Sequence, residues 1–241
     1  MVKQERAIRT RNLILEAMAD LFNDVGYDAA TIAALVKRTG LTRGALYFHF
    51  ASKEEMARSV LEEALTREGL RPQTFKLQEW VDLGLLLAYR LPREPMLRAA
   101  IRLSVDPKAR RLFGTRWPDW VVLGHDLLAE AKDRGELVSH ADPAGISRLV
   151  VGAWTGVHLV TDALPDALDL SEEISGLYQL LLPSIVSPAV LAKLDMSPYR
   201  AERLLREGVA PAGGPSGQSA RGGGAGNGHR GNGHRGDNGA V

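Results

Sequence analysis

The stretch TIAALVKRTGLTRGALYFHFASK, residues 31–53, carries the signals of two short helices joined by a tight turn. Thr31 can cap a helix whose apolar residues recur at helical spacing over residues 32–36. Gly40 follows, and glycine tolerates the positive φ at which a helix ends sharply. Thr42 can then cap the second helix. This layout is typical of a helix-turn-helix, whose second helix enters the major groove of DNA.

The second helix turns few side chains outward, and their chemistry suits a DNA groove. Arg43 can reach a guanine or a phosphate, and Gly44 lets the backbone come close to either. Tyr47 and His49 can donate to phosphate oxygens, which are the contacts that fix the register of a protein on DNA. We therefore predict that this helix binds double-stranded operator DNA.

Flanking residues extend the predicted surface. Thr31 and Lys53 lie at helix N-termini, which favour anions. Residues 1–53 hold eight Lys and Arg against five Asp and Glu, and the basic arm that contains Arg6 can follow the neighbouring minor groove. The predicted DNA-binding residues are Arg6, Thr31, Thr42, Arg43, Gly44, Tyr47, His49 and Lys53.

The same stretch resembles the DNA-binding domain of TetR-type repressors, which share the pattern Gly-x-x-x-Gly-x-x-Tyr-x-x-Phe-x-x-Lys. Here the pattern falls on Gly40, Gly44, Tyr47, Phe50 and Lys53. The segment GALYFHFASKEE, residues 44–55, is more narrowly similar to the γ-butyrolactone receptor branch of that family, found in antibiotic-producing actinomycetes. The resemblance implies a homodimeric repressor, released from DNA by a small signalling molecule, that regulates antibiotic biosynthesis.

Helical spacing recurs along the chain without any array of strands, so the sequence predicts an all-α fold. An apolar stripe from Ile14 to Val25, closed by Gly26, predicts the first helix, and a capping box from Ser52 to Glu55 opens a helix to about Arg67. Further helices are expected over residues 76–91, 95–106, 117–135, 142–164 and 174–182, with a last short one after residue 187. A loop is expected between residues 107 and 117.

Three parts are predicted along the chain: a helix-turn-helix DNA-binding domain over residues 1–52, a larger helical ligand-binding and dimerisation domain over 53–206, and a disordered glycine-rich tail over 207–241. The tail holds His229 and His234 but no carboxylate or thiolate cluster that would complete a metal shell, so neither a metal nor a cofactor is expected. The absence of cysteine and of an N-terminal apolar segment favours a soluble, cytoplasmic, nucleoid-associated protein.

The resemblance also implies where a ligand binds. A tryptophan in the helix that ends in GEL lines the pocket of these receptors, and Trp120 occupies the matching position. A threonine or serine on the opposing helix matches Thr161 in GAWTGVHLVTDAL, residues 152–164, where the receptors read GAFTGVQ. Neighbours within two turns are expected to share its face. The predicted ligand-binding residues are Trp120, Trp154, Val157, His158 and Thr161, although Trp154 filling the core is an equal alternative.

The helices that begin at Asp142 and near Ser171 are the candidates for a four-helix bundle with a second copy of the chain. A second possible function is that of a pseudo-receptor, which responds to an antibiotic or a biosynthetic intermediate. This alternative is kept because Ala64 occupies a position where receptors often carry a glutamine. An enzyme is a remote alternative, since the chain has no Gly-x-Ser-x-Gly, P-loop or His-Glu-x-x-His motif and we predict no catalytic residue. A purely structural role would leave Arg43 and Tyr47 dispensable.

Overall fold

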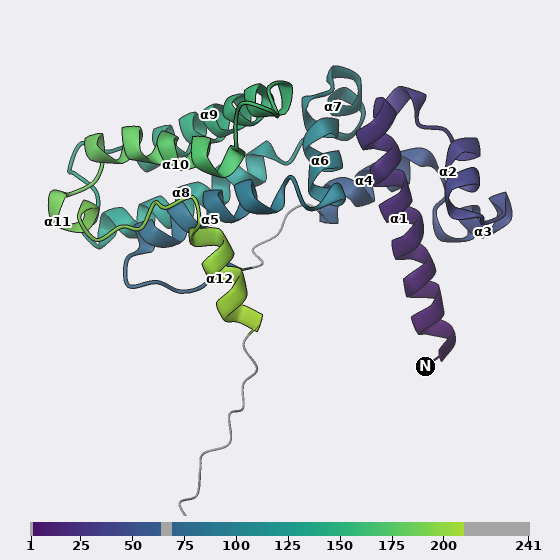
Figure 1. Ribbon diagram of the computed structural model, residues 1–241, viewed down its shortest axis with the longest axis horizontal. Coiled ribbons are helices and arrows are strands. Elements are labelled where there is room, and N and C mark those ends of the chain that lie inside the picture. The colour runs from purple at the N-terminus through teal and green to yellow at the C-terminus, as the bar shows by residue number, and fades with distance from the viewer. Residues whose placement is uncertain (1, 64–68, 210–241) are drawn as a thin grey trace, which may run out of the picture. The chain divides into compact units, whose positions relative to one another are not determined.

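The computed structural model describes residues 2–63 and 69–209, and every regular element in these ranges is a helix (Figure 1). The only pairing of extended chain within them is an isolated antiparallel bridge between Leu137 and Val186. The elements are α1 (Val2–Ala29), α2 (Ile32–Thr39), α3 (Arg43–His49), α4 (Lys53–Glu63), α5 (Lys76–Arg90), α6 (Pro95–Val105), α7 (Pro107–Phe113), α8 (Trp117–Asp133), α9 (Pro143–Ala163), α10 (Leu170–Leu181), the 3-10 turn η1 (Leu182–Ser184), α11 (Pro188–Leu191) and α12 (Arg200–Val209). The prediction of an all-α fold is confirmed.

The helix-turn-helix forms as its capping residues predict. The Thr31 hydroxyl accepts a hydrogen bond from the Ala34 amide at 3.1 Å, and the Thr42 hydroxyl accepts one from the Ala45 amide at 3.2 Å. Gly40 ends α2 with φ at 69°, a left-handed conformation that few other residues adopt. These three residues fix where α2 starts, where it stops and where α3 starts.

The first helix departs from its prediction in one detail. Gly26, with φ at 76°, breaks the helical conformation as expected, but α1 resumes beyond it to Ala29. Val25 was expected in the apolar stripe, and that placement is wrong because the kink turns its side chain outward, where it is 49% exposed. Ile14, Met18 and Phe22 are buried as predicted.

The capping box of α4 is offset by one residue. The Glu55 amide donates to the Ser52 hydroxyl at 3.1 Å, as predicted, but the Glu55 carboxylate accepts from the Ala51 amide at 2.5 Å instead of from the Ser52 amide. The expected end of this helix near Arg67, and Ala64 with it, lie outside the described residues.

Helices α5, α8, α9 and α10 lie side by side and build most of the larger helical region (Figure 1). The α5 N-terminus has no side-chain cap of its own, and the distant, buried Glu136 supplies one by accepting from the Lys76 and Leu77 amides at 3.0 and 2.8 Å. Asp142 caps α9 by accepting from the Ala144 and Gly145 amides. Both ends are thus fixed by carboxylates at helix N-termini.

Two helices were missed by the sequence analysis. Residues 107–113 form α7 and not a loop, because Asp106 accepts from two amides of its first turn and Pro107 occupies the first helical position. The short helix after residue 187 is also not the last, since α12 follows it. Arg200 of α12 forms a two-pronged ion pair with the fully buried Asp82 of α5, and Leu204 is buried.

The described residues form one compact unit, so the division after residue 52 stays a prediction. Residues 210–241, with His229, His234 and most of the predicted tail, lie outside the described residues. No helix among the described residues is long and apolar enough to cross a membrane.

Candidate nucleic-acid interface and cavity

The outer face of α3 presents the side chains that the sequence analysis selected. Thr42, Arg43 and Gly44 are exposed, and Tyr47 is 51% exposed, while Leu46 is buried and holds the helix against the core. The α3 surface, as we call residues 42–49, therefore combines a cation, a phenol and a backbone without a side chain. Such a surface can contact phosphates and base edges.

Phe48 is the residue of the α3 surface that the sequence analysis missed. It is 81% exposed, and the His49 ring packs edge-on against it with centroids 5.2 Å apart. An exposed phenylalanine on a groove-reading helix can contact the methyl group of thymine. Helical periodicity could have found it, because position 48 lies on the face opposite to the buried Leu46.

Three predicted DNA-binding residues flank the α3 surface, and they differ in whether their side chains are exposed or already hydrogen-bonded within the protein. Arg6 and Thr31 are exposed. Lys53 is instead engaged, because its ammonium donates to the Tyr27 and Ala30 carbonyls at 2.9 and 3.0 Å and lies 4.1 Å from the centre of the Tyr27 ring. Burial lowers the pKa of this lysine, although Asp28 and Glu54 oppose the shift. Lys53 thus ties the start of α4 to the end of α1, and its contact with DNA stays a prediction.

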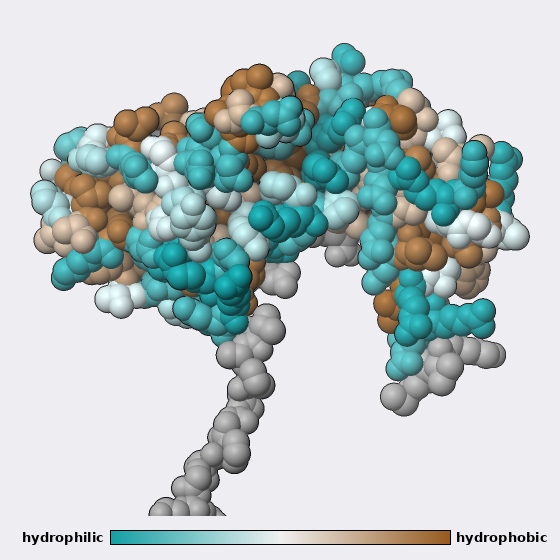
Figure 2. Space-filling view, in the orientation of Figure 1, coloured by the Kyte–Doolittle hydropathy of each residue, from teal (hydrophilic) through white to brown (hydrophobic). Residues whose placement is uncertain are grey.

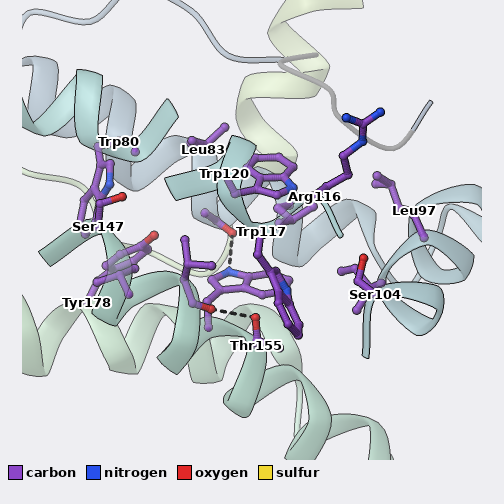
Figure 3. A pocket seen from close by; sticks show the side chains of 18 residues that line it. Trp80, Leu83, Leu97, Ser104, Arg116, Trp117, Trp120, Ser147, Thr155 and Tyr178 are labelled. Atoms are coloured by element: carbon purple, nitrogen blue, oxygen red, sulfur yellow. Dashed lines mark hydrogen bonds between the residues drawn. The ribbon is translucent and has the colours of Figure 1, made fainter. Parts of the chain in front are cut away.

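A cavity of about 100 Å³ lies among α5, α6, α8, α9 and α10. All four tryptophans of the chain line it, as Figure 3 shows for the three that it labels. The Trp154 indole donates to the Gly84 carbonyl at 3.3 Å, which fixes that ring against α5. Apolar side chains, four of them indoles, form most of the wall, as in sites that bind small organic molecules. The tryptophans are Trp80, Trp117, Trp120 and Trp154.

Two of the five predicted ligand-binding residues line the cavity, namely Trp120 and Trp154, and the other three do not. Thr161 is buried, and its hydroxyl donates to the Val157 carbonyl at 2.9 Å one turn earlier. His158 is buried with its ring centre 6.0 Å from that of Trp154. Within the segment GAWTGVHLVTDAL, residues 152–164, the threonine that lines the cavity is Thr155 and not Thr161.

The cavity also contains polar groups that the sequence analysis did not select. Trp80, Ser104 and Tyr178 are buried, and they line the cavity with an indole and two hydroxyl-bearing side chains. Burial, and next the charge of Asp82, raise the pKa of Tyr178 well above its usual range, so its hydroxyl keeps its proton. Buried polar groups are normally satisfied. The indole N–H and the two hydroxyls are groups that can hydrogen-bond to polar atoms of a bound molecule.

The charges at the cavity are already neutralised. Arg116 is its one charged lining residue in the described ranges, and its guanidinium donates to the Leu61 carbonyl at 3.1 Å and pairs with Asp119 at 3.3 Å. No group of three His, Cys, Asp or Glu residues that could hold a metal ion occurs in the part of the chain that the structure describes.

A third feature is an apolar surface on α9 and α10, visible over α9 in Figure 2. Leu149 is 75% exposed and Leu180 is 84% exposed. A Cβ atom added to Gly152, Gly156 or Gly176 would meet nothing within 4 Å, so another backbone can approach these positions closely. We call these five residues the α9–α10 surface.

Comparisons with known proteins agree with one another. The sequence model described as bacterial regulatory proteins, tetR family, matches residues 14–60. The A-factor receptor protein of Streptomyces griseus is 34% identical over 214 residues, which cover 86% of this chain and 77% of that protein. The crystal structure of native TylP, a TetR regulator from Streptomyces fradiae, superimposes with a TM-score of 0.74 at 37% identity, covering 85% of this chain and 99% of the other. A γ-butyrolactone receptor described as ArpA-like gives a TM-score of 0.68 at 26% identity, covering 84% of this chain and 99% of the other.

Proposed function

This chain belongs to the tetR family of bacterial regulatory proteins, and we propose that it is a cytoplasmic transcriptional repressor that a γ-butyrolactone-type molecule releases from operator DNA. The observation that carries the proposal is a single compact unit with two separate features. One is the exposed α3 surface, and the other is a tryptophan-lined cavity that contains buried polar side chains. We assign the cavity a role in ligand binding and not in catalysis, because the relatives of this chain are regulators.

Binding to DNA is supported by what α3 exposes. Arg43 and Tyr47 supply charge and a phenolic donor, and Phe48 adds an apolar contact. As a homodimer, two copies of α3 would address two half-sites of a pseudo-palindromic operator. The α9–α10 surface supports the dimer, because large exposed leucines beside open glycines offer apolar area and close approach.

Binding of a neutral molecule is supported by the lining of the cavity. Its wall is mostly indole and aliphatic, its polar groups are uncharged, and Arg116 is already paired. A lactone carries an acceptor carbonyl that an indole N–H or a phenol can satisfy, and an alkyl tail suits the apolar wall. A receptor for A-factor and a γ-butyrolactone receptor are among its relatives.

A different small molecule is the second candidate. Thr161, which the receptor motif implies as a ligand contact, lies outside the cavity lining, and Thr155 lies within it. Such a change in the polar contacts favours a pseudo-receptor that answers to an antibiotic or an intermediate. In both cases the ligand acts by shifting the dimer towards a separation of the two α3 helices that no longer matches the operator.

The test is fluorescence anisotropy with a labelled duplex from upstream of the protein's own gene, followed by addition of synthetic γ-butyrolactones. We expect tight binding at moderate salt and release by a lactone. Binding that every lactone leaves intact would select the second candidate, and the antibiotics of the producing strain would then be titrated in the same way. Absence of binding to this duplex, and to a genomic library of upstream regions, would contradict the proposal.

A further inference from the structure

Arg116 is a cavity-lining residue that hydrogen-bonds to α4. It stands immediately before α8, and its neighbours Trp117 and Trp120 line the cavity with it. In Figure 3 its guanidinium points away from the tryptophans. The Nε atom donates to the Leu61 carbonyl in the last described turns of α4, at 3.1 Å. Among the described residues, no other cavity-lining side chain has a hydrogen bond to α1, α2, α3 or α4.

The helix that Arg116 contacts is firmly attached to the DNA-binding end of the molecule. Lys53, the first residue of α4, donates to two carbonyls at the end of α1, and Glu54 accepts from the Tyr27 hydroxyl at 3.2 Å. Met56 and Val60 of α4 are fully buried. A displacement of α4 is therefore transmitted to α1 and to the helices that follow it, because packed helices move as units.

The start of α8 joins Arg116 to two tryptophans of the cavity wall. The Trp120 amide donates to the Arg116 carbonyl at 3.2 Å, so the backbone of Arg116 belongs to the same helical turn as the two tryptophans. Asp119, within that turn, pairs with the guanidinium at 3.3 Å through Nη1, whereas the bond to Leu61 uses Nε. A molecule that displaces Trp117 or Trp120 must carry Arg116 with it.

We propose that Arg116 is a positioning residue that couples occupancy of the cavity to DNA affinity through its hydrogen bond to the Leu61 carbonyl of α4. The inference rests on the proposed function and adds the route of its regulation. In the free protein the bond holds α4 where the structure shows it, and ligand binding shifts or breaks the bond. By linkage, operator binding must then also alter the cavity.

The experiment compares full-length wild-type protein with Arg116→Met, which keeps the stem and removes the donor, and Arg116→Lys, which keeps a cation able to reach a carbonyl. Asp119→Asn and Arg111→Met are the controls, the first removing only the ion pair and the second an exposed arginine on α7. Three quantities are measured for each: operator affinity by anisotropy, lactone affinity by tryptophan fluorescence, and the loss of operator affinity at saturating lactone.

We expect Arg116→Met, which lacks the bond that ligand binding shifts or breaks, to bind operator without lactone nearly as weakly as the wild type does at saturating lactone. The lactone-induced loss of operator affinity should therefore shrink by about tenfold or more, within the usual size of coupling between two sites. Arg116→Lys should restore part of the wild-type difference between operator affinity with and without lactone. The two controls should behave as the wild type. A merely structural role would lower operator affinity equally with and without lactone and leave the coupling unchanged. Wild-type coupling in Arg116→Met would overturn the proposal and assign the route to α6.

A second readout needs no ligand. Because every tryptophan of the chain lines the cavity, its fluorescence reports on the cavity alone. Saturating operator should change the emission or its quenching by acrylamide in the wild type and in Arg111→Met, but not in Arg116→Met. If lactones prove inert, this measurement still decides the role of Arg116, so failure of the ligand assignment is separate from failure of the coupling. An emission unchanged by operator in the wild type would overturn the proposal.

Discussion

At the scale of single residues, the two candidate sites place their polar groups in opposite ways. The phenol of Tyr47 is half exposed and free to meet a phosphate, whereas that of Tyr178 is buried against α5 beside a cavity. A Cβ on Gly84 would lie 2.0 Å from the Tyr178 hydroxyl, so only glycine leaves room for it. The same side chain thus serves a surface in one place and a closed wall in the other, and its burial decides which.

Replacing Tyr47 with phenylalanine should weaken operator binding without affecting the fold. The change removes one hydrogen bond to a charged group, which is worth a loss of about tenfold in affinity. Anisotropy at fixed moderate salt measures it, and Tyr199→Phe, another exposed tyrosine, serves as the control. Unchanged affinity in both Tyr47→Phe and Tyr47→Ala would exclude this residue from the DNA interface.

Replacing Trp120 with alanine should spare operator binding and abolish release by the ligand. The truncation removes a flat apolar contact from the cavity wall, and loss of a large buried contact costs about 3 kcal/mol, or roughly a hundredfold in ligand affinity. Titration followed through the three remaining tryptophans measures the affinity. Val122→Ala, at an exposed position of the same helix, is the control. Release at the wild-type ligand concentration would identify Trp120 as core packing.

His158 should make the fold sensitive to mild acid. Burial lowers its pKa from the ordinary 6.5, with Asp162 opposing the shift, so the unfolded chain binds the proton more readily than the folded protein. Stability must therefore fall as the pH drops below about 6.5. The carboxylates whose pKa values are lowered, such as Glu54 and Asp195, lose their contribution only at lower pH.

The thermal midpoint at pH 7.5 and pH 5.2 measures this effect. The drop should shrink in His158→Gln, which has the glutamine found at this position in the receptor motif that the sequence resembles. It should persist in His140→Gln, because His140 is exposed. An equal drop in both variants would show that another group is responsible.

At the scale of elements, helix N-caps were the features that could be predicted best from the sequence. Thr31, Thr42 and Asp142 cap the helices predicted for them, since each cap needs only neighbours in sequence. Asp106 followed by Pro107 repeats the pattern of Asp142 and was overlooked, so α7 was predictable. The α12 helix was harder to predict, because its anchor, Asp82, is 118 residues away from Arg200.

The cavity was also hard to predict, because it too depends on contacts between residues that are far apart in the sequence. Trp120 was found by resemblance and Trp154 by its helical spacing from Thr161, but Trp80, Ser104 and Tyr178 come from three other helices, and only packing brings them together. Periodicity assigns each of these three to a buried face without saying whether that face meets a neighbour or an empty space. The outward residues of α3 were more accessible to prediction, because one short helix determines them all.

Glu136 should be the most sensitive cap of the larger helical region. Its two carboxylate oxygens accept from the Lys76 and Leu77 amides, and it is 4% exposed. Glutamine has a single acceptor oxygen, so Glu136→Gln leaves one buried amide facing an NH₂ group and should lower the free energy of unfolding by about 1–3 kcal/mol. Urea denaturation measures it. Glu130→Gln, at an exposed ion pair, should cost less than about 1 kcal/mol, and equal losses would contradict the role of Glu136.

At the scale of the whole molecule, the α9–α10 surface is the proposed interface between two copies of the chain. Its leucines contact little in the single chain, so charge introduced there leaves the fold intact but must be desolvated if a second copy packs against it. Leu180→Glu should therefore give a folded monomer by sedimentation equilibrium, with an unchanged thermal midpoint at high dilution. Operator affinity should fall steeply, because a monomer presents one α3 helix and gains nothing from the second half-site. Leu112→Glu, which makes the same substitution at an exposed leucine of α7, should stay dimeric and bind operator as the wild type does. A dimeric Leu180→Glu would move the interface elsewhere, and a monomeric one with full affinity would separate DNA binding from dimerisation.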